Sequence, residues 1–156
     1  MNESVKSGLS FGLTSGIITT LGLIIGLGIG TNSKTVVIAG ILTIAFVDAL
    51  SDSFGIHIAK ESEKKGVKEI WVASGATLFS KIIITLTFLI PVLFLDLNNA
   101  LIASILWSIV LLIILSSEIA RSNKKSKRKV IFEHLVIAVI VIILTFVIGE
   151  LISFIL

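Results

Sequence analysis

The sequence predicts an all-α integral membrane protein with five transmembrane helices, and three observations carry that prediction. Of the 156 residues, 55% are hydrophobic and only 15% are charged. The mean hydropathy is +1.12, and a soluble domain of this length could not bury so much apolar surface. The apolar residues also fall into five runs, each close to the ~20 residues that a helix needs to cross a bilayer. We therefore treat residues 1–156 as a single transmembrane domain.

The predicted spans cover about 8–30, 36–58, 72–95, 100–120 and 130–155. The first is longer than the apolar core of a signal peptide, and the segment before it has one Glu and one Lys, so we interpret it as a retained span. Lys and Arg concentrate in the connections 60–69 and 121–129. The positive-inside rule then places both connections and the N-terminus in the cytoplasm, and the C-terminus outside.

The net charge of +3 arises largely in these basic connections. The expected partner is therefore the lipid bilayer and not nucleic acid. The absence of Cys excludes disulfides, covalent haem attachment and thiolate metal sites. We expect the protein to reside in the cytoplasmic membrane of a prokaryote.

The first span carries a stripe of glycines, which project within a sector of about 120° on one face if the span is helical. The glycines are Gly8, Gly12, Gly16, Gly22, Gly26 and Gly30. Small residues at this spacing let another helix approach closely. We predict close packing along this stripe, either within the chain or in a homodimer.

The second and third spans contain ionisable residues inside their apolar runs. Asp48 and Asp52 lie four residues apart, on one face of the second span. Counted from the cytoplasmic ends of the spans, Asp52 lies about 12 Å deep, Lys81 about 15 Å and Asp48 about 18 Å. The three charges therefore share one layer. Ionisable residues at this depth are functional candidates by default. Lys81 is either a structural counter-ion or a gate.

Other polar side chains complete the predicted site. Ser15, Thr19 and Ser51 are candidate neutral ligands at the same layer. A second set near the cytoplasmic surface is a candidate metal-entry vestibule, and consists of His57, Glu61, Glu63, Glu118, Glu133 and His134. For any single member of that set, we favour a role in balancing the basic connections. Pro91 falls near the outer end of the third span, where a kink is tolerated if neighbouring groups satisfy the freed carbonyl, and the last two spans are predicted to be mostly scaffold.

Together these segments resemble the vacuolar iron transporter family. Residues 15–27, SGIITTLGLIIGL, are similar to the family's first span, and residues 39–57 are similar to its second. Residues 90–92 resemble the late proline of its third span. The resemblance implies a homodimeric carrier that moves Fe²⁺ or Mn²⁺ out of the cytosol in exchange for protons. It also implies that the first two spans line the path near the dimer interface, and that the metal is cargo and not a tightly bound cofactor.

The chain departs from the family pattern at the ligands. The family's first-span Asp corresponds to Ser15, its second-span Met to Asp52, and its Gly-Glu-Tyr to Gly55, Ile56 and His57. The family's Glu-rich helices between spans two and three are reduced here to a short loop. A carboxylate in place of a thioether makes the site harder, which shifts its preference from Fe²⁺ toward Mn²⁺, Mg²⁺ or Ca²⁺.

The leading hypothesis is a secondary transporter for a divalent cation, in which Asp48 and Asp52 bind the metal and accept protons. One alternative keeps the fold and changes the cationic cargo. Another is a non-transporting assembly or regulatory protein in which Asp48, Asp52 and Lys81 form a structural triad. An enzyme is not expected, because we find no His cluster, activated nucleophile or phosphate-binding glycine loop placed to support catalysis.

Overall fold

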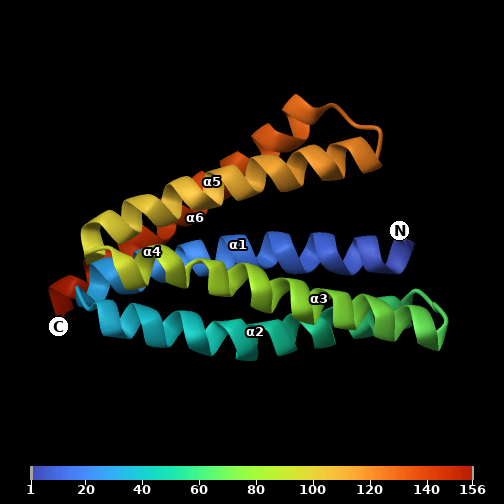
Figure 1. Cartoon of the computed structure of the whole chain (residues 1–156), viewed down its shortest axis with the longest axis horizontal. Helices are drawn as coiled ribbons and strands as arrows, with labels where there is room; N and C mark the ends of the chain where they lie inside the picture. The colour runs from blue at the N-terminus through green and yellow to red at the C-terminus, as the bar shows by residue number, and fades with distance from the viewer. Residues whose placement is uncertain (1, 156) are drawn as a thin grey trace.

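The computed structural model describes residues 2–155, which form a bundle of long helices (Figure 1). The helices are α1 (Glu3–Thr31), α2 (Lys34–Ser62), α3 (Val67–Thr87), α4 (Leu89–Phe94), α5 (Leu97–Ser122) and α6 (Lys127–Ile155). When α3 and α4 are counted as one interrupted span, five helices are long and apolar enough to cross a membrane. This confirms the all-α fold, and each predicted span coincides with one of these helices to within about five residues at its ends.

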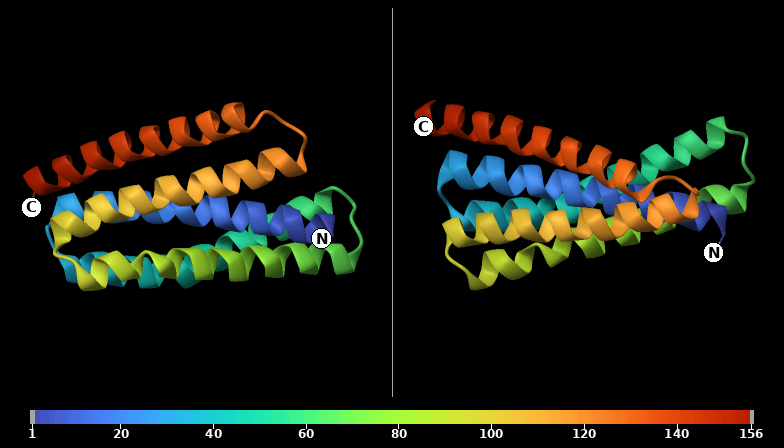
Figure 2. Two further views of the ribbon diagram at one scale, coloured as in Figure 1. Left: turned by 45° about the horizontal axis from the view of Figure 1, so that its top comes forward. Right: turned by 90° about the horizontal axis from the view of Figure 1, so that it is seen from above.

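The N-terminus and the two basic connections lie together at one end of the bundle, which we call the basic end (Figures 1 and 2). The connections are residues 63–66, between α2 and α3, and residues 123–126, between α5 and α6. The short turns after α1 and α4 lie at the opposite end, with the C-terminus (Figure 1). The predicted topology requires the N-terminus and both basic connections to lie at the same end of the bundle, and they do (Figure 1). The face of the membrane that the basic end meets stays a prediction.

Polar residues in the sequence mark where three helices begin. The side chains of Asn2, Ser33 and Asp96 each accept a hydrogen bond from a backbone N–H of the following first turn, which is the usual role of these residue types at an N-cap. Asn99 donates to Asp96 from both its side chain and its backbone, and these bonds hold the pKa of Asp96 below its usual range. Asn32 ends α1 in the left-handed conformation, with φ at 45°.

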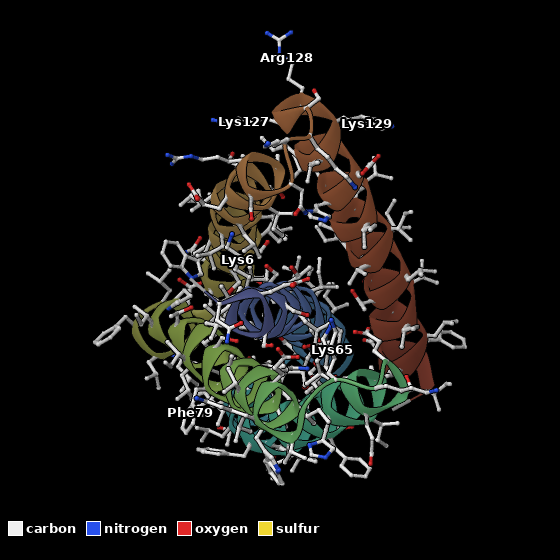
Figure 3. All side chains as sticks on the ribbon, turned by 90° about the vertical axis from the view of Figure 1, so that its right-hand side faces the viewer. Lys6, Lys65, Phe79, Lys127, Arg128 and Lys129 are labelled. Atoms are coloured by element: carbon white, nitrogen blue, oxygen red, sulfur yellow. The ribbon has the colours of Figure 1, made fainter. Side chains whose placement is uncertain are left out.

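Helix α1 lies in the middle of the bundle, with α2, α3, α5 and α6 packed around it (Figure 3). Its glycine stripe packs against two neighbouring helices, α3 and α6. Gly8, Gly12 and Gly16 face α3, whereas Gly22, Gly26 and Gly30 face α6. The predicted close packing is therefore confirmed within the chain. The homodimer through the first two helices stays a prediction, and in this arrangement α3 and α6 already cover the glycine face of α1.

The third span is interrupted between α3 and α4, at Phe88. Pro91 has no backbone N–H, so it cannot bond to the carbonyl of Thr87 as a helical residue would. The helix is interrupted just before this proline, where we expected a kink to be tolerated, and neighbouring side chains bond to polar groups around it. Trp107 Nε1 donates to the Thr87 hydroxyl at 3.0 Å, and Lys34 Nζ donates to the carbonyls of Leu93 and Leu95, both at 2.9 Å.

The Lys34 ammonium thus binds carbonyl groups at the end of α4, where a cation also complements the helix dipole. We expect Lys34→Met to lower the stability of the purified protein by about 1–2 kcal/mol, because two charge-assisted hydrogen bonds are lost at a half-buried site. Thermal unfolding in detergent micelles measures this. Lys68→Met, the same change at an exposed position of α3, is the matched control. Equal stability of the two variants would contradict this role for Lys34.

Candidate cation site inside the bundle

A fully buried lysine lies between two carboxylates near the middle of the bundle. The Lys81 side chain, on α3, is 0% exposed, and its Nζ is 2.6 Å from Asp48 Oδ2 and also contacts Asp52 Oδ2. Both aspartates belong to α2, one turn apart, and their side chains are 30% and 20% exposed. The predicted shared layer of three charges is confirmed, and Lys81 pairs with both aspartates.

Ser15 brings α1 into the same site. Its hydroxyl donates to Asp52 Oδ2 at 2.6 Å and accepts a hydrogen bond from Lys81 Nζ at 3.0 Å. Gly12 and Gly16 flank this residue, and their missing side chains let α1 approach α3 closely enough for Ser15 to reach the lysine. We call Ser15, Asp48, Asp52 and Lys81 the charged layer. Three helices contribute to it.

The two aspartates are held differently. Asp52 receives hydrogen bonds from both Lys81 and Ser15. Asp48 Oδ2 lies at ion-pair distance from Lys81 but, within residues 2–155, has no hydrogen bond of acceptable geometry. Asp48 is therefore held in the layer by its ion pair with Lys81, whereas Asp52 has Ser15 as a second partner.

The charged layer carries one more negative than positive group. Two carboxylates and one ammonium, if all are ionised, sum to a net charge of −1. An unpaired charge in the low-dielectric interior costs several kcal/mol, which explains why the buried ammonium has two acidic partners. The excess negative charge lies on the partly exposed aspartates and not on the buried lysine. The layer can thus attract a further cation or a proton from its exposed side.

Two predicted neutral ligands are not drawn into the charged layer. Thr19 is exposed, and its hydroxyl donates to the Ser15 carbonyl of its own helix at 2.9 Å. Such local bonding competes with any longer-range role for a helical hydroxyl. Ser51 is exposed on α2, and the hydrogen bonds of the charged layer run between Ser15, Asp52 and Lys81 without it. Of the three hydroxyl groups predicted as ligands, only Ser15 joins the aspartates.

The two histidines predicted at the metal entry link neighbouring helices instead. His57 Nδ1 lies 3.3 Å from the Ser74 hydroxyl, and the His57 ring packs edge-on against Trp71 with ring centroids 4.8 Å apart. His134 Nδ1 lies 2.7 Å from the Ser116 hydroxyl. These contacts join α2 to α3 and α5 to α6. Each serine lies on a different helix from its histidine, so the pairing depends on helix register, which sequence spacing does not supply.

The predicted acidic vestibule is not assembled either. Glu63, which follows the last residue of α2, pairs with Lys60 at 3.0 Å, and Glu118 lies 4.0 Å from Arg121 within α5. Both are local pairs between residues three apart in the sequence. Glu61 and Glu133 are exposed. Within residues 2–155, no group of three or more His, Asp or Glu side chains comes together in a way that could hold a metal ion. Glu63 and Glu118 thus balance nearby basic side chains, which is the role we favoured for each of them singly. For Glu61 and Glu133 that role stays a prediction.

No protein-family model matches this chain, and no curated protein is detectably similar to it in sequence. The resemblance to the vacuolar iron transporters therefore rests on residues 15–27, 39–57 and 90–92. The function that it implies stays a proposal, and the charged layer is the strongest guide to it.

Proposed function

We propose that the protein is a secondary transporter that moves a divalent metal cation, Fe²⁺ or Mn²⁺, out of the cytosol in exchange for protons. In this proposal it is a divergent member of the vacuolar iron transporter family. The observation that carries the proposal is the fully buried Lys81 ammonium held by two carboxylates at mid-depth of five apolar helices. Charged side chains at such depth are rare, and they mark ion pathways and proton relays.

The environment of the Lys81 ammonium is one that suits a metal cation. Oxygen atoms of Asp48, Asp52 and Ser15 surround the Nζ atom, and they come from two helices other than the one that carries the lysine. Hard divalent cations prefer carboxylate, hydroxyl and water oxygen ligands of this kind. The exposed sides of the two aspartates leave space for water to complete a coordination shell of about six ligands.

A proton and a divalent cation would compete for these oxygens. Lys81 acts as the resting counter-ion of the two carboxylates. When Lys81 moves away from them, the carboxylates offer a combined charge of −2, which one divalent ion or two protons can balance. Because ligands must lose competing protons before they bind metal, binding and proton release are coupled. That competition is the property an antiporter requires.

Flux measured in proteoliposomes tests this proposal. We expect Mn²⁺ entry driven by a pH gradient, with Asp48→Asn or Asp52→Asn reducing it to the background of empty liposomes, because an amide cannot supply the negative charge. Asp96→Asn is the matched control. It makes the same chemical change outside the charged layer, and Asn caps a helix as well as Asp does. Wild-type flux equal to that of empty liposomes would contradict the proposal.

The complete pairing of Lys81 favours a second class of function. A buried ion pair can serve to fix the register of packed helices, and the charged layer links α1, α2 and α3 in this way. The protein would then be a non-transporting assembly or regulatory subunit. A transporter with another cationic cargo is a variant of the first proposal. Repeating the flux assay with protons alone and with organic cations distinguishes that variant.

A further inference from the structure

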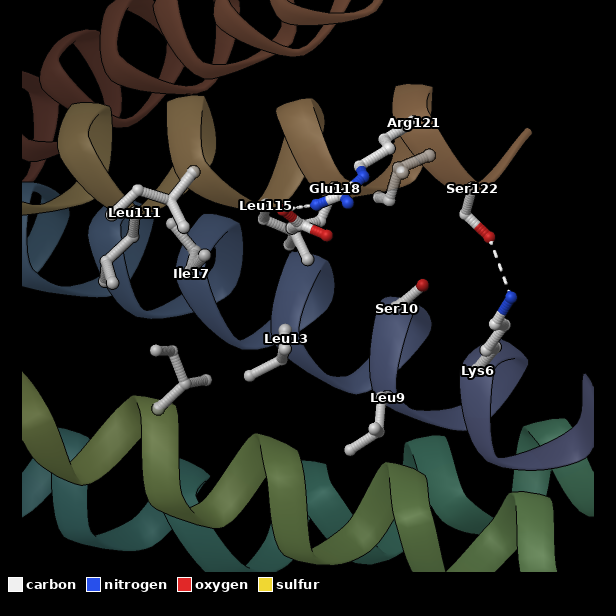
Figure 4. Close-up of a pocket in the computed structure, with 13 residues that line it drawn as sticks. Lys6, Leu9, Ser10, Leu13, Ile17, Leu111, Leu115, Glu118, Arg121 and Ser122 are labelled. Carbon is white, nitrogen blue, oxygen red and sulfur yellow. Dashed lines mark hydrogen bonds and ion pairs between the residues drawn. The ribbon is translucent and has the colours of Figure 1, made fainter. Parts of the chain in front are cut away.

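A cleft lies between α1 and α5 at the basic end, away from the charged layer (Figure 4). Its volume is about 600 Å³, within the ~300–1,000 Å³ of ordinary small-molecule sites. It exists because α5 diverges from α1 toward the basic end (Figure 1). At the other end the two helices pack closely, where Leu101 meets Gly28.

The walls of the cleft are apolar along most of its length. They are formed by Leu9, Leu13 and Ile17 of α1, Ile84 of α3, and Leu111 and Leu115 of α5. From Lys6 at the mouth to Ile17, α1 rises about 16 Å, which is half of the hydrocarbon thickness of a bilayer. The cleft thus runs parallel to a lipid acyl chain, and its depth fits one leaflet.

The mouth of the cleft is polar and carries two cations from different helices. Lys6 of α1 and Arg121 of α5 are both exposed there, and Lys6 Nζ donates to the Ser122 hydroxyl at 3.1 Å (Figure 4). The acid at the mouth, Glu118, lies 4.0 Å from Arg121, so Lys6, Arg121 and Glu118 together give the mouth a net positive charge. Further basic side chains project from the same end (Figure 3), namely Lys127, Arg128 and Lys129.

We propose that this cleft binds an anionic phospholipid, with an acyl chain between α1 and α5 and the headgroup phosphate between Lys6 and Arg121. Charge complementarity selects this occupant. Along its depth the cleft offers a soluble anion only the Ser10 hydroxyl among the described residues that line it, whereas a lipid uses both the apolar walls and the cations at the mouth. Arg recognises phosphate through paired N–H donors, and each basic residue at a membrane surface strengthens binding to anionic lipid.

Native mass spectrometry of the full chain in detergent tests this proposal, with dioleoyl phosphatidylglycerol and dioleoyl phosphatidylcholine as probes. The wild type is expected to retain the anionic lipid at least tenfold more strongly. Lys6→Ala with Arg121→Ala should remove most of that preference, by roughly tenfold to thirtyfold for two surface cations. Lys127→Ala with Arg128→Ala makes the same change in net charge outside the cleft, and should change the preference less than threefold.

Two further measurements distinguish a lipid-binding cleft from a site for soluble anions and from unspecific attraction of anionic lipid to the basic end. Ser10→Phe fills the cleft without changing charge, and should weaken phosphatidylglycerol binding at least fivefold. Inorganic phosphate and glycerophosphoglycerol, which lack acyl chains, should fail to bind at millimolar concentration. The proposal is overturned if the two lipids bind equally to the wild type, if both double variants lose the preference equally, or if phosphate alone binds as well as the lipid. Circular dichroism and gel filtration confirm that each variant is folded.

Discussion

Lys81→Met is expected to destabilise the protein by about 3–5 kcal/mol, which is the largest loss of stability that we expect from any single substitution in this chain. The substitution keeps most of the length of the side chain but removes the cation that Asp48 and Asp52 share. Two carboxylates one turn apart would then face each other inside the bundle with only the Ser15 hydroxyl as a neighbouring donor. Equilibrium unfolding of the purified protein in mixed micelles measures the loss.

The triple variant Asp48→Asn/Asp52→Asn/Lys81→Met separates folding from function. It removes all three charges together, so no buried charge is left unpaired, and we expect most of the lost stability to return. It should nevertheless give no Mn²⁺ flux, because the ligands are gone. A triple variant that is stable and still transports would show that the charged layer is not the transport site. A Lys81→Met protein as stable as the wild type would show that the lysine is not needed to balance the aspartates.

Gly12→Ala is expected to cost about 3 kcal/mol, at the upper end of the ~1–3 kcal/mol typical of overpacking. A Cβ at this position would lie 2.5 Å from the Thr77 carbonyl oxygen and closer still to the Ser80 hydroxyl. The carbonyl belongs to the backbone of α3 and cannot rotate away, so α1 and α3 must separate. That movement would also carry Ser15 away from Lys81, and we expect flux to fall together with stability.

Gly75→Ala is the matched control for that change. Gly75 also lies within a helix, α3, but a Cβ there would meet no atom within 4 Å. The substitution should be neutral or should stabilise the protein by up to ~1 kcal/mol, since Ala forms helix more readily than Gly. Thermal unfolding of the two variants side by side measures both effects. If both variants unfold at the same temperature, the close approach of α1 and α3 does not limit stability.

The fold could be predicted from the sequence because membrane spans depend on local signals. Apolar runs of sufficient length, the basic connections and Pro91 each act within a few residues of themselves, and the helices and the interruption after Thr87 follow from them. Such local signals could not predict which helices pack against the glycine stripe. One face of α1 meets α3 along its first half and α6 along its second, and this division depends on the path of distant helices.

The charged layer could be predicted in part, by measuring the depth of each charge along its own span. Depth alone placed Asp48, Asp52 and Lys81 together, since charges at equal depth in one small bundle must pair. It did not reveal that Lys81 would be fully buried while both aspartates stay partly exposed. Rotation about the helix axis decides this, as it also decides that Thr19 and Ser51 remain outside the layer. The Ser74 and Ser116 partners of the histidines were missed for the same reason.

Titration calorimetry of Mn²⁺ into the purified protein, in two buffers of different protonation enthalpy, tests the central claim most directly. Parallel titrations with Fe²⁺, Co²⁺, Mg²⁺ and Ca²⁺ establish which cation the site prefers. The charged layer predicts saturable binding of one of these ions with release of protons, because the metal and protons compete for the carboxylate oxygens of Asp48 and Asp52. The neutral triple variant should show neither binding nor release. Failure of all five ions to bind at millimolar concentration, or binding that survives in the triple variant, would contradict the claim that this layer exchanges a cation for protons.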